Sequence, residues 1–237
     1  MGRFSHLARL LENDGHDVTA RDREPLSDGS DAVLSRLDSS GFDELWLIAV
    51  DTGNGLAPAD VRGILRFREK GRGVLTARDH QNLGASLLNL GSIGSVNNFS
   101  TYNRERDRRR FRRNSGNNGD YQRIVPLEPV HEVLRSQRSP SGVIEYFPAH
   151  PHEGALSVPD DWHYARPIAT SQSARNGRVF NLAVAIDNEP AVNGRAIALS
   201  TFHQLSDFNF DESDPERLEI YKDYLRNIAR WLSPERI

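Results

Sequence analysis

The sequence has 237 residues, a formal net charge of −3, 37% hydrophobic and 27% charged residues, and no cysteine. This composition is typical of a globular protein of one α/β domain, and it excludes disulfides, thiolate metal sites and thiol nucleophiles. The sequence also lacks a signal peptide, a run of ~20 apolar residues and a basic excess, so we expect a cytoplasmic protein that binds neither membranes nor nucleic acid.

The first part of the chain alternates between helical and strand patterns. Residues 44–50 (ELWLIAV) form a continuous apolar run, which is typical of a parallel strand buried on both faces. In chain order we expect a helix over residues 4–11, a strand over 16–20, a helix over 31–37, a strand over 44–50, a helix beginning at Pro58, a strand over 74–77 and a helix over about 80–90. This alternation predicts right-handed crossovers and a parallel sheet.

The order of these elements is unusual at the start. Doubly wound folds normally open on a strand that lies centrally in the sheet, whereas this sequence opens on a helix. We therefore expect that the sequence as given lacks the first strand of its fold.

The second part of the chain begins with an Arg-rich stretch at about 100–120, which predicts a solvated loop insertion. Phosphate or nucleic-acid binding is the alternative interpretation, but Glu105 and Asp107 dilute the positive charge. Further on we expect a short helix over 130–134, strands over 142–147, 166–170, 179–186 and 195–201, a turn at 188–193, and a final helix over 213–232 that Asp214 and Pro215 begin.

Three segments resemble the class I glutamine amidotransferase-like superfamily, including its ThuA-like branch. They are residues 43–51, residues 71–84 (GRGVLTARDHQNLG), which look like the strand, elbow and helix of that family, and residues 196–203 (AIALSTFH), which end on a histidine. The resemblance implies one domain over residues 1–237, with a flavodoxin-like three-layer α/β sandwich and a mainly parallel central sheet.

The family places its cysteine nucleophile at the tip of the elbow, where this sequence has Arg78 or Asp79, depending on the register. The resemblance therefore does not carry glutaminase activity over to this chain. His203 matches the family's catalytic histidine, but position 205 is Leu205 where the family has an acidic residue, and Asp207 is the nearest substitute.

Several side chains should gather where the strands end, because ligands of open α/β sheets bind there. Asp79, His80 and His203 are the candidate catalytic residues, although Asp79 could instead cap the helix that follows it. The candidate substrate-binding residues are Arg78, Asp51, Asn54, Glu153 and Asp207.

A second histidine group lies at His150-Pro151-His152-Glu153. The proline favours an extended backbone, so the two imidazoles should project to the same side at a spacing that can grip one divalent metal ion. A polar loop whose histidines bond the backbone is the alternative.

Three functions remain open. The first is a small-molecule hydrolase, related to carbohydrate metabolism through the ThuA-like resemblance, that uses a His/carboxylate pocket. The second is a non-catalytic ligand-binding or regulatory module, and the third is a metal-dependent enzyme. Each of them takes a small-molecule ligand, and self-association into a homo-oligomer is left open.

Overall fold

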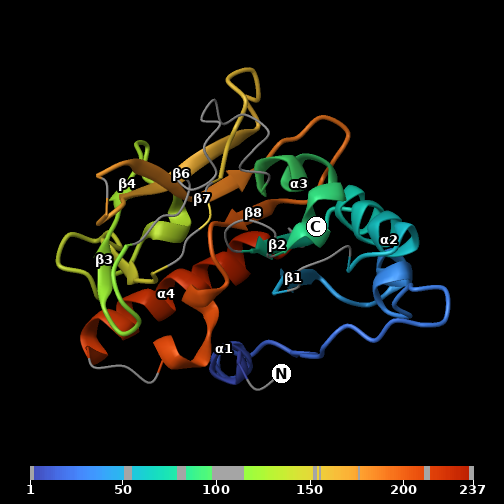
Figure 1. The fold of residues 1–237 in the computed structure, drawn as a ribbon, viewed down its shortest axis with the longest axis horizontal. Coiled ribbons are helices and arrows are strands. Elements are labelled where there is room, and N and C mark those ends of the chain that lie inside the picture. The colour runs from blue at the N-terminus through green and yellow to red at the C-terminus, as the bar shows by residue number, and fades with distance from the viewer. Residues whose placement is uncertain are drawn as a thin grey trace.

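The computed structural model describes residues 3–50, 55–78, 84–97, 115–151, 154, 156–175, 177–210 and 214–234. A six-stranded sheet runs through the molecule in the order β1-β2-β8-β7-β6-β4, and β3 and β5 form a separate two-stranded sheet (Figure 1). The strands are β1 (Glu44–Ile48), β2 (Gly73–Ala77), β3 (Tyr121–Arg123), β4 (Val125–Pro126), β5 (Tyr146–Pro148), β6 (Ala165–Gln172), β7 (Val179–Ile186) and β8 (Ala196–Leu199).

The central sheet is mixed, so the prediction of a mainly parallel sheet was wrong. The strands predicted at 44–50, 74–77 and 195–201 correspond to β1, β2 and β8, which are parallel neighbours, and β1 lies at the edge of the sheet. In the rest of the sheet, β8, β7, β6 and β4, each strand is antiparallel to its neighbour. Short turns join β6 to β7 and β7 to β8, and a parallel pair would need a longer crossover.

Each face of the sheet buries its own hydrophobic cluster, which gives three layers. In β2, Leu75 and Ala77 face a cluster shared with α1 (Ser5–Asn13) and α4 (Pro215–Leu232), here called cluster 1. Val74 faces a second cluster shared with α2 (Pro58–Glu69) and α3 (Gly91–Asn97), here called cluster 2. Figure 1 shows α1 and α4 on one side of the sheet and α2 and α3 on the other. The flavodoxin-like, three-layer arrangement is therefore present.

The final helix, α4, forms as its sequence predicts. The side chain of Asp214 accepts a hydrogen bond from the N–H of Arg217 (3.0 Å), and Pro215 occupies the first turn. Its apolar stripe is buried in cluster 1: Leu218, Tyr221, Leu225, Ile228 and Leu232. No helix among the described residues is both long and apolar enough to cross a bilayer.

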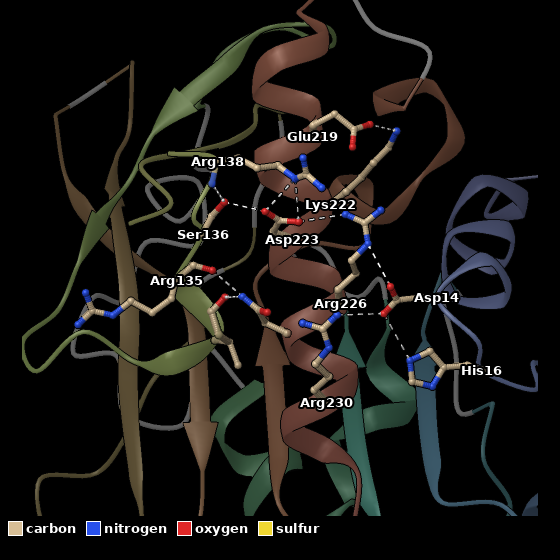
Figure 2. Close-up of polar contacts among 12 residues, drawn as sticks. Asp14, His16, Arg135, Ser136, Arg138, Glu219, Lys222, Asp223, Arg226 and Arg230 are labelled. Carbon is tan, nitrogen blue, oxygen red and sulfur yellow. Dashed lines mark hydrogen bonds and ion pairs between the residues drawn. The ribbon is translucent and has the colours of Figure 1, made fainter. Parts of the chain in front are cut away.

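Polar contacts on the outer side of α4 fasten two other segments to it (Figure 2). Asp223 accepts a hydrogen bond from the hydroxyl of Ser136 (2.7 Å) and pairs with Arg226. Arg226 and Arg230 both pair with Asp14, the residue that follows α1. The end of α1 is thereby held beside α4.

Four predicted elements differ from the structure. Residues 16–20 form no strand, because no neighbouring strand pairs with them. The helices expected over 31–37 and 130–134 are short 3₁₀ segments, η1 (Leu34–Ser39) and η4 (Glu132–Leu134). In the described part of the helix expected over 80–90, another 3₁₀ segment, η2 (Ala85–Asn89), precedes α3. The Arg-rich residues 100–114 lie outside the described ranges.

Candidate functional site

The candidate site lies where β2 and β8 end side by side. Ala77 pairs with Leu199, so Arg78 and Ser200 leave the sheet as neighbours at its carboxyl edge. The chain after β8 then turns into two 3₁₀ segments, η5 (His203–Leu205) and η6 (Asp207–Asn209). The N–H of His203 donates to the hydroxyl oxygen of Thr201 (3.1 Å), which fixes the start of this turn.

His150 reaches the same edge from β5. Its backbone N–H donates to the hydroxyl of Ser115 (2.9 Å), and its carbonyl accepts from the N–H of Ser115 (3.1 Å). Shortly after it, the N–H of Gly154 donates to the carbonyl of Ser200 (3.0 Å). These bonds hold the segment after β5 against the end of β8.

The two histidines meet directly. The imidazole rings of His150 and His203 are stacked, with centroids 3.4 Å apart and an interplanar angle of 11°. The side chain of His150 is buried, and that of His203 is half-buried. Phe202 lies 4.1 Å from His203 between ring centroids, and Phe208 lies 6.2 Å from His203 and 6.3 Å from His150. Phe208 is 37% exposed, so the cluster of rings reaches the surface.

This stacking does not suit a shared metal ion. An imidazole nitrogen binds a metal along a lone pair in the plane of its own ring, at about 2.0–2.1 Å for zinc. Two nearly parallel rings in contact share no point within metal–ligand distance that lies in both ring planes, so His150 and His203 cannot chelate one ion together in this arrangement. Among the described residues, no three His, Asp or Glu side chains form a group that could hold a metal.

Arg78 is buried at the end of β2 and supports the neighbouring helix. Its guanidinium donates to the carbonyl of Asn97 (2.9 Å), the last residue of α3, where a positive charge complements the helix dipole. The amide of Asn97 in turn donates to the hydroxyl of Thr76 (2.8 Å) in β2. Arg78 therefore stabilises the end of α3 and also lies at the sheet edge that forms the candidate site.

Asp207, the nearest substitute for the family's acidic residue, is used elsewhere. One carboxylate oxygen accepts from the hydroxyl of Ser5 and the other from the N–H of His6, both at 2.8 Å, at the first turn of α1. Desolvation opposes ionisation of this group, but the hydrogen bonds from His6 and Ser5 outweigh it and lower the pKa of Asp207. Asp207 thus caps α1 from a distant loop.

The structure thus brings together His150 and His203 and places Arg78 at the same sheet edge. The other candidate residues lie outside the described ranges: Asp51, Asn54, Asp79, His80, His152 and Glu153. Ser115 and Phe208 were not among the predicted site residues. Phe208 lies in the sequence close to His203, but nothing there distinguishes it from Phe210, and no spacing in the sequence points to Ser115.

No protein-family model matches the chain, and no curated protein matches its sequence. Its structure is similar to the mmIFT52 N-terminal domain (TM-score 0.58, 14% identity, 98% of this chain and 91% of that one). It is also similar to a putative ThuA-like protein from Parabacteroides merdae (TM-score 0.52, 13% identity, 99% and 87%). A third similar structure is the cytoplasmic protein STM3548 from Salmonella typhimurium (TM-score 0.50, 13% identity, 97% and 86%). At such identities the likeness shows the fold alone, a ThuA-like α/β fold.

Proposed function

We propose that this chain is a small-molecule-binding protein of the amidotransferase-like superfamily that has no glutaminase activity. The observation that carries the proposal is the stacked pair of His150 and His203 beside the exposed Phe208. The partly exposed ring of Phe208 offers an apolar surface beside the two imidazoles, and imidazole is a side chain that can both donate and accept hydrogen bonds, a combination that suits a small ligand. The place of the pair, at the carboxyl edge of parallel strands, is where ligands of open α/β sheets bind.

The arrangement favours binding over triad catalysis. A triad histidine works as a base when a carboxylate orients its ring toward a nucleophile. Here both carboxylate oxygens of Asp207 serve α1, and the sequence contains no thiol. The resemblance to ThuA-like proteins places carbohydrate-related compounds first among candidate ligands, and a cytoplasmic location and self-association are further parts of the proposal.

A ligand panel tests the proposal by thermal shift, followed by calorimetry on compounds that raise the melting temperature. His203→Phe and His150→Phe keep a flat ring but remove the nitrogens, so they should weaken binding at least tenfold. His163→Phe is the matched control, because His163 is exposed on another segment. A ligand that binds equally well to both site variants would contradict the proposal.

A hydrolase is the second candidate. It is favoured by the position of His203 just after β8, next to the strand whose end leads through Arg78 to Asp79. Asp79 would exchange protons with the substrate, and His203 would bind or polarise it. Asp79→Asn keeps a helix-capping side chain but removes carboxylate chemistry. If the protein hydrolyses a ligand and the Asp79→Asn variant turns it over at an unchanged rate, that role for Asp79 is excluded.

A metal-dependent enzyme is the third candidate, with His150 and His152 as ligands. It requires the ring of His150 to leave its stack on His203, since the stacked pair cannot share an ion. Elemental analysis of the purified protein, with His152→Ala as the variant, tests this candidate. Less than about one tenth of an equivalent of bound metal would reject it.

A further inference from the structure

The edge strand β1 has the apolar sequence that is typical of a strand in the interior of a sheet. Four of its five residues, Leu45 to Ile48, carry apolar side chains that alternate between both faces, a pattern typical of strands covered on both sides. Yet among the described strands β1 pairs only with β2, and each of its five residues is only half-buried. Of the features that usually protect a sheet edge from pairing, β1 has one charged residue, Glu44 at its start, and no lysine, proline or bulge within its five residues.

The free edge offers a regular row of hydrogen-bonding groups. The carbonyl of Asp43 and the N–H of Ala49 both bond β2, and alternation along a strand directs residues 45 and 47 the same way. The N–H and carbonyl groups of Glu44, Trp46 and Ile48 therefore point away from β2. In the described part of the chain no strand pairs with this side.

Both core layers are incomplete at the same place. Trp46 and Ile48 pack on cluster 1, as Phe4 and Leu11 do, and all four side chains are only partly buried. On the opposite face Leu45 and Leu47 pack on cluster 2, as Phe42 does, and are again partly buried. A ligand at this edge would therefore complete two apolar layers at once.

We infer that the β1 edge binds one extended peptide strand that carries apolar side chains on both faces. Such a strand would bond Glu44, Trp46 and Ile48 through its main chain and fill both clusters with alternate side chains. One strand suffices to pair with the five residues of β1 and to contact both clusters. Pairing of β1 between two copies of this chain is the alternative, which the experiment below distinguishes.

The conformation of residues 16–20 is consistent with this inference. Their sequence predicts a strand, but they pair with none of the described strands. A strand added to β1 would give this segment an edge beside which it could lie.

Amide hydrogen exchange, followed by two-dimensional NMR, tests the inference with a lysine-flanked Val-Ile-Val-Ile-Val peptide as the probe. Without peptide, the amides of Trp46 and Ile48 should exchange at least tenfold faster than those of Leu45 and Leu47. Saturating peptide should slow Trp46 and Ile48 at least tenfold. A control peptide with proline at the central valine should have no effect, because proline lacks the N–H and does not fit a paired strand.

Variants locate the binding edge. Trp46→Lys should weaken peptide binding at least tenfold, with Leu45→Lys as the second variant if the first does not fold. Val179→Lys replaces an apolar side chain that is 67% exposed on β7 and should leave binding unchanged. The inference is overturned if the proline peptide protects equally, or if the amides of Trp46 and Ile48 are already protected in the chain alone. Protection that grows with protein concentration in the absence of peptide would also overturn it, because it would indicate pairing between copies.

Discussion

The imidazole of His150 lies flat on the imidazole of His203, with 3.4 Å between ring centroids. The two residues follow strands of different sheets, β5 and β8. Their contact depends on the bonds from His150 to Ser115 and from Gly154 to Ser200. The site is therefore made where the small sheet meets the carboxyl edge of the large one.

The first prediction is that the purified protein releases no ammonia from glutamine. The amidotransferase reaction needs a thiolate that forms an acyl-enzyme, and the chain contains no cysteine. A coupled ammonia assay, with a known glutaminase as the positive control, measures the release. Activity that persists through successive purification steps would contradict the prediction.

The second prediction concerns Asp207. Asp207→Ala should lower the free energy of unfolding by about 0.5–2 kcal/mol, because it removes the cap of α1. Asp161→Ala, at an exposed carboxylate, should change little. Urea unfolding at pH 7 measures both.

The effect of Asp207 should also depend on pH. Because its pKa is lowered in the folded state, its ionised form contributes stability above the unfolded pKa of about 3.9. That contribution is lost as the pH falls through the lower, folded pKa. The difference between wild type and Asp207→Ala should therefore shrink in acid, and a constant difference down to pH 2 would contradict this role.

The third prediction concerns His131, which caps η4 and packs edge-on against Trp231. Burial, helped by the charge of Arg166, lowers its pKa to about 4. Between about pH 6.5 and pH 4 the unfolded chain binds more protons than the folded one, so stability should fall as the pH falls. His131→Asn keeps a capping side chain but does not titrate, so its stability should fall less between pH 7 and pH 5. An equal fall in both proteins would contradict the prediction, and exposed His163→Asn is the control.

The fourth prediction tests the packing of α4 on β2. A Cβ at Gly73 would lie 2.3 Å from the carbonyl oxygen and 2.7 Å from the Cβ of Leu232. Gly73→Ala should therefore destabilise the protein by about 1–3 kcal/mol through overpacking. Gly41→Ala is the matched control, because nothing lies within 4 Å of its added Cβ. Similar unfolding midpoints for the two variants would contradict this packing.

Local patterns predicted much of the fold. The apolar run at residues 44–50, the apolar strand at 74–77 and the capped stripe of α4 each became the expected element. The predicted direction of β7, parallel to β8, was wrong, although the length of the connection between the two strands already indicated an antiparallel pair. The turn predicted at 188–193 is too short for the crossover that parallel neighbours need.

The site was harder to predict, because its contacts join distant parts of the chain. Asp207 was chosen for its nearness to position 205, but it bonds His6, which lies 201 positions away. His150 was chosen as a metal ligand for its spacing from His152, but its ring packs on His203. Neither the capping of α1 by Asp207 nor the ring contact follows from a local pattern.

The bonds of Asp207 to Ser5 and His6 also connect two events that look independent. The loop that carries His203 and the docking of α1 share one carboxylate, so the two are coupled, and linkage requires the coupling free energy to be the same in both directions. A ligand held by His203 would therefore reduce the population of chains in which α1 is frayed. Equally, a partner that pulls α1 away would loosen the loop and release the ligand.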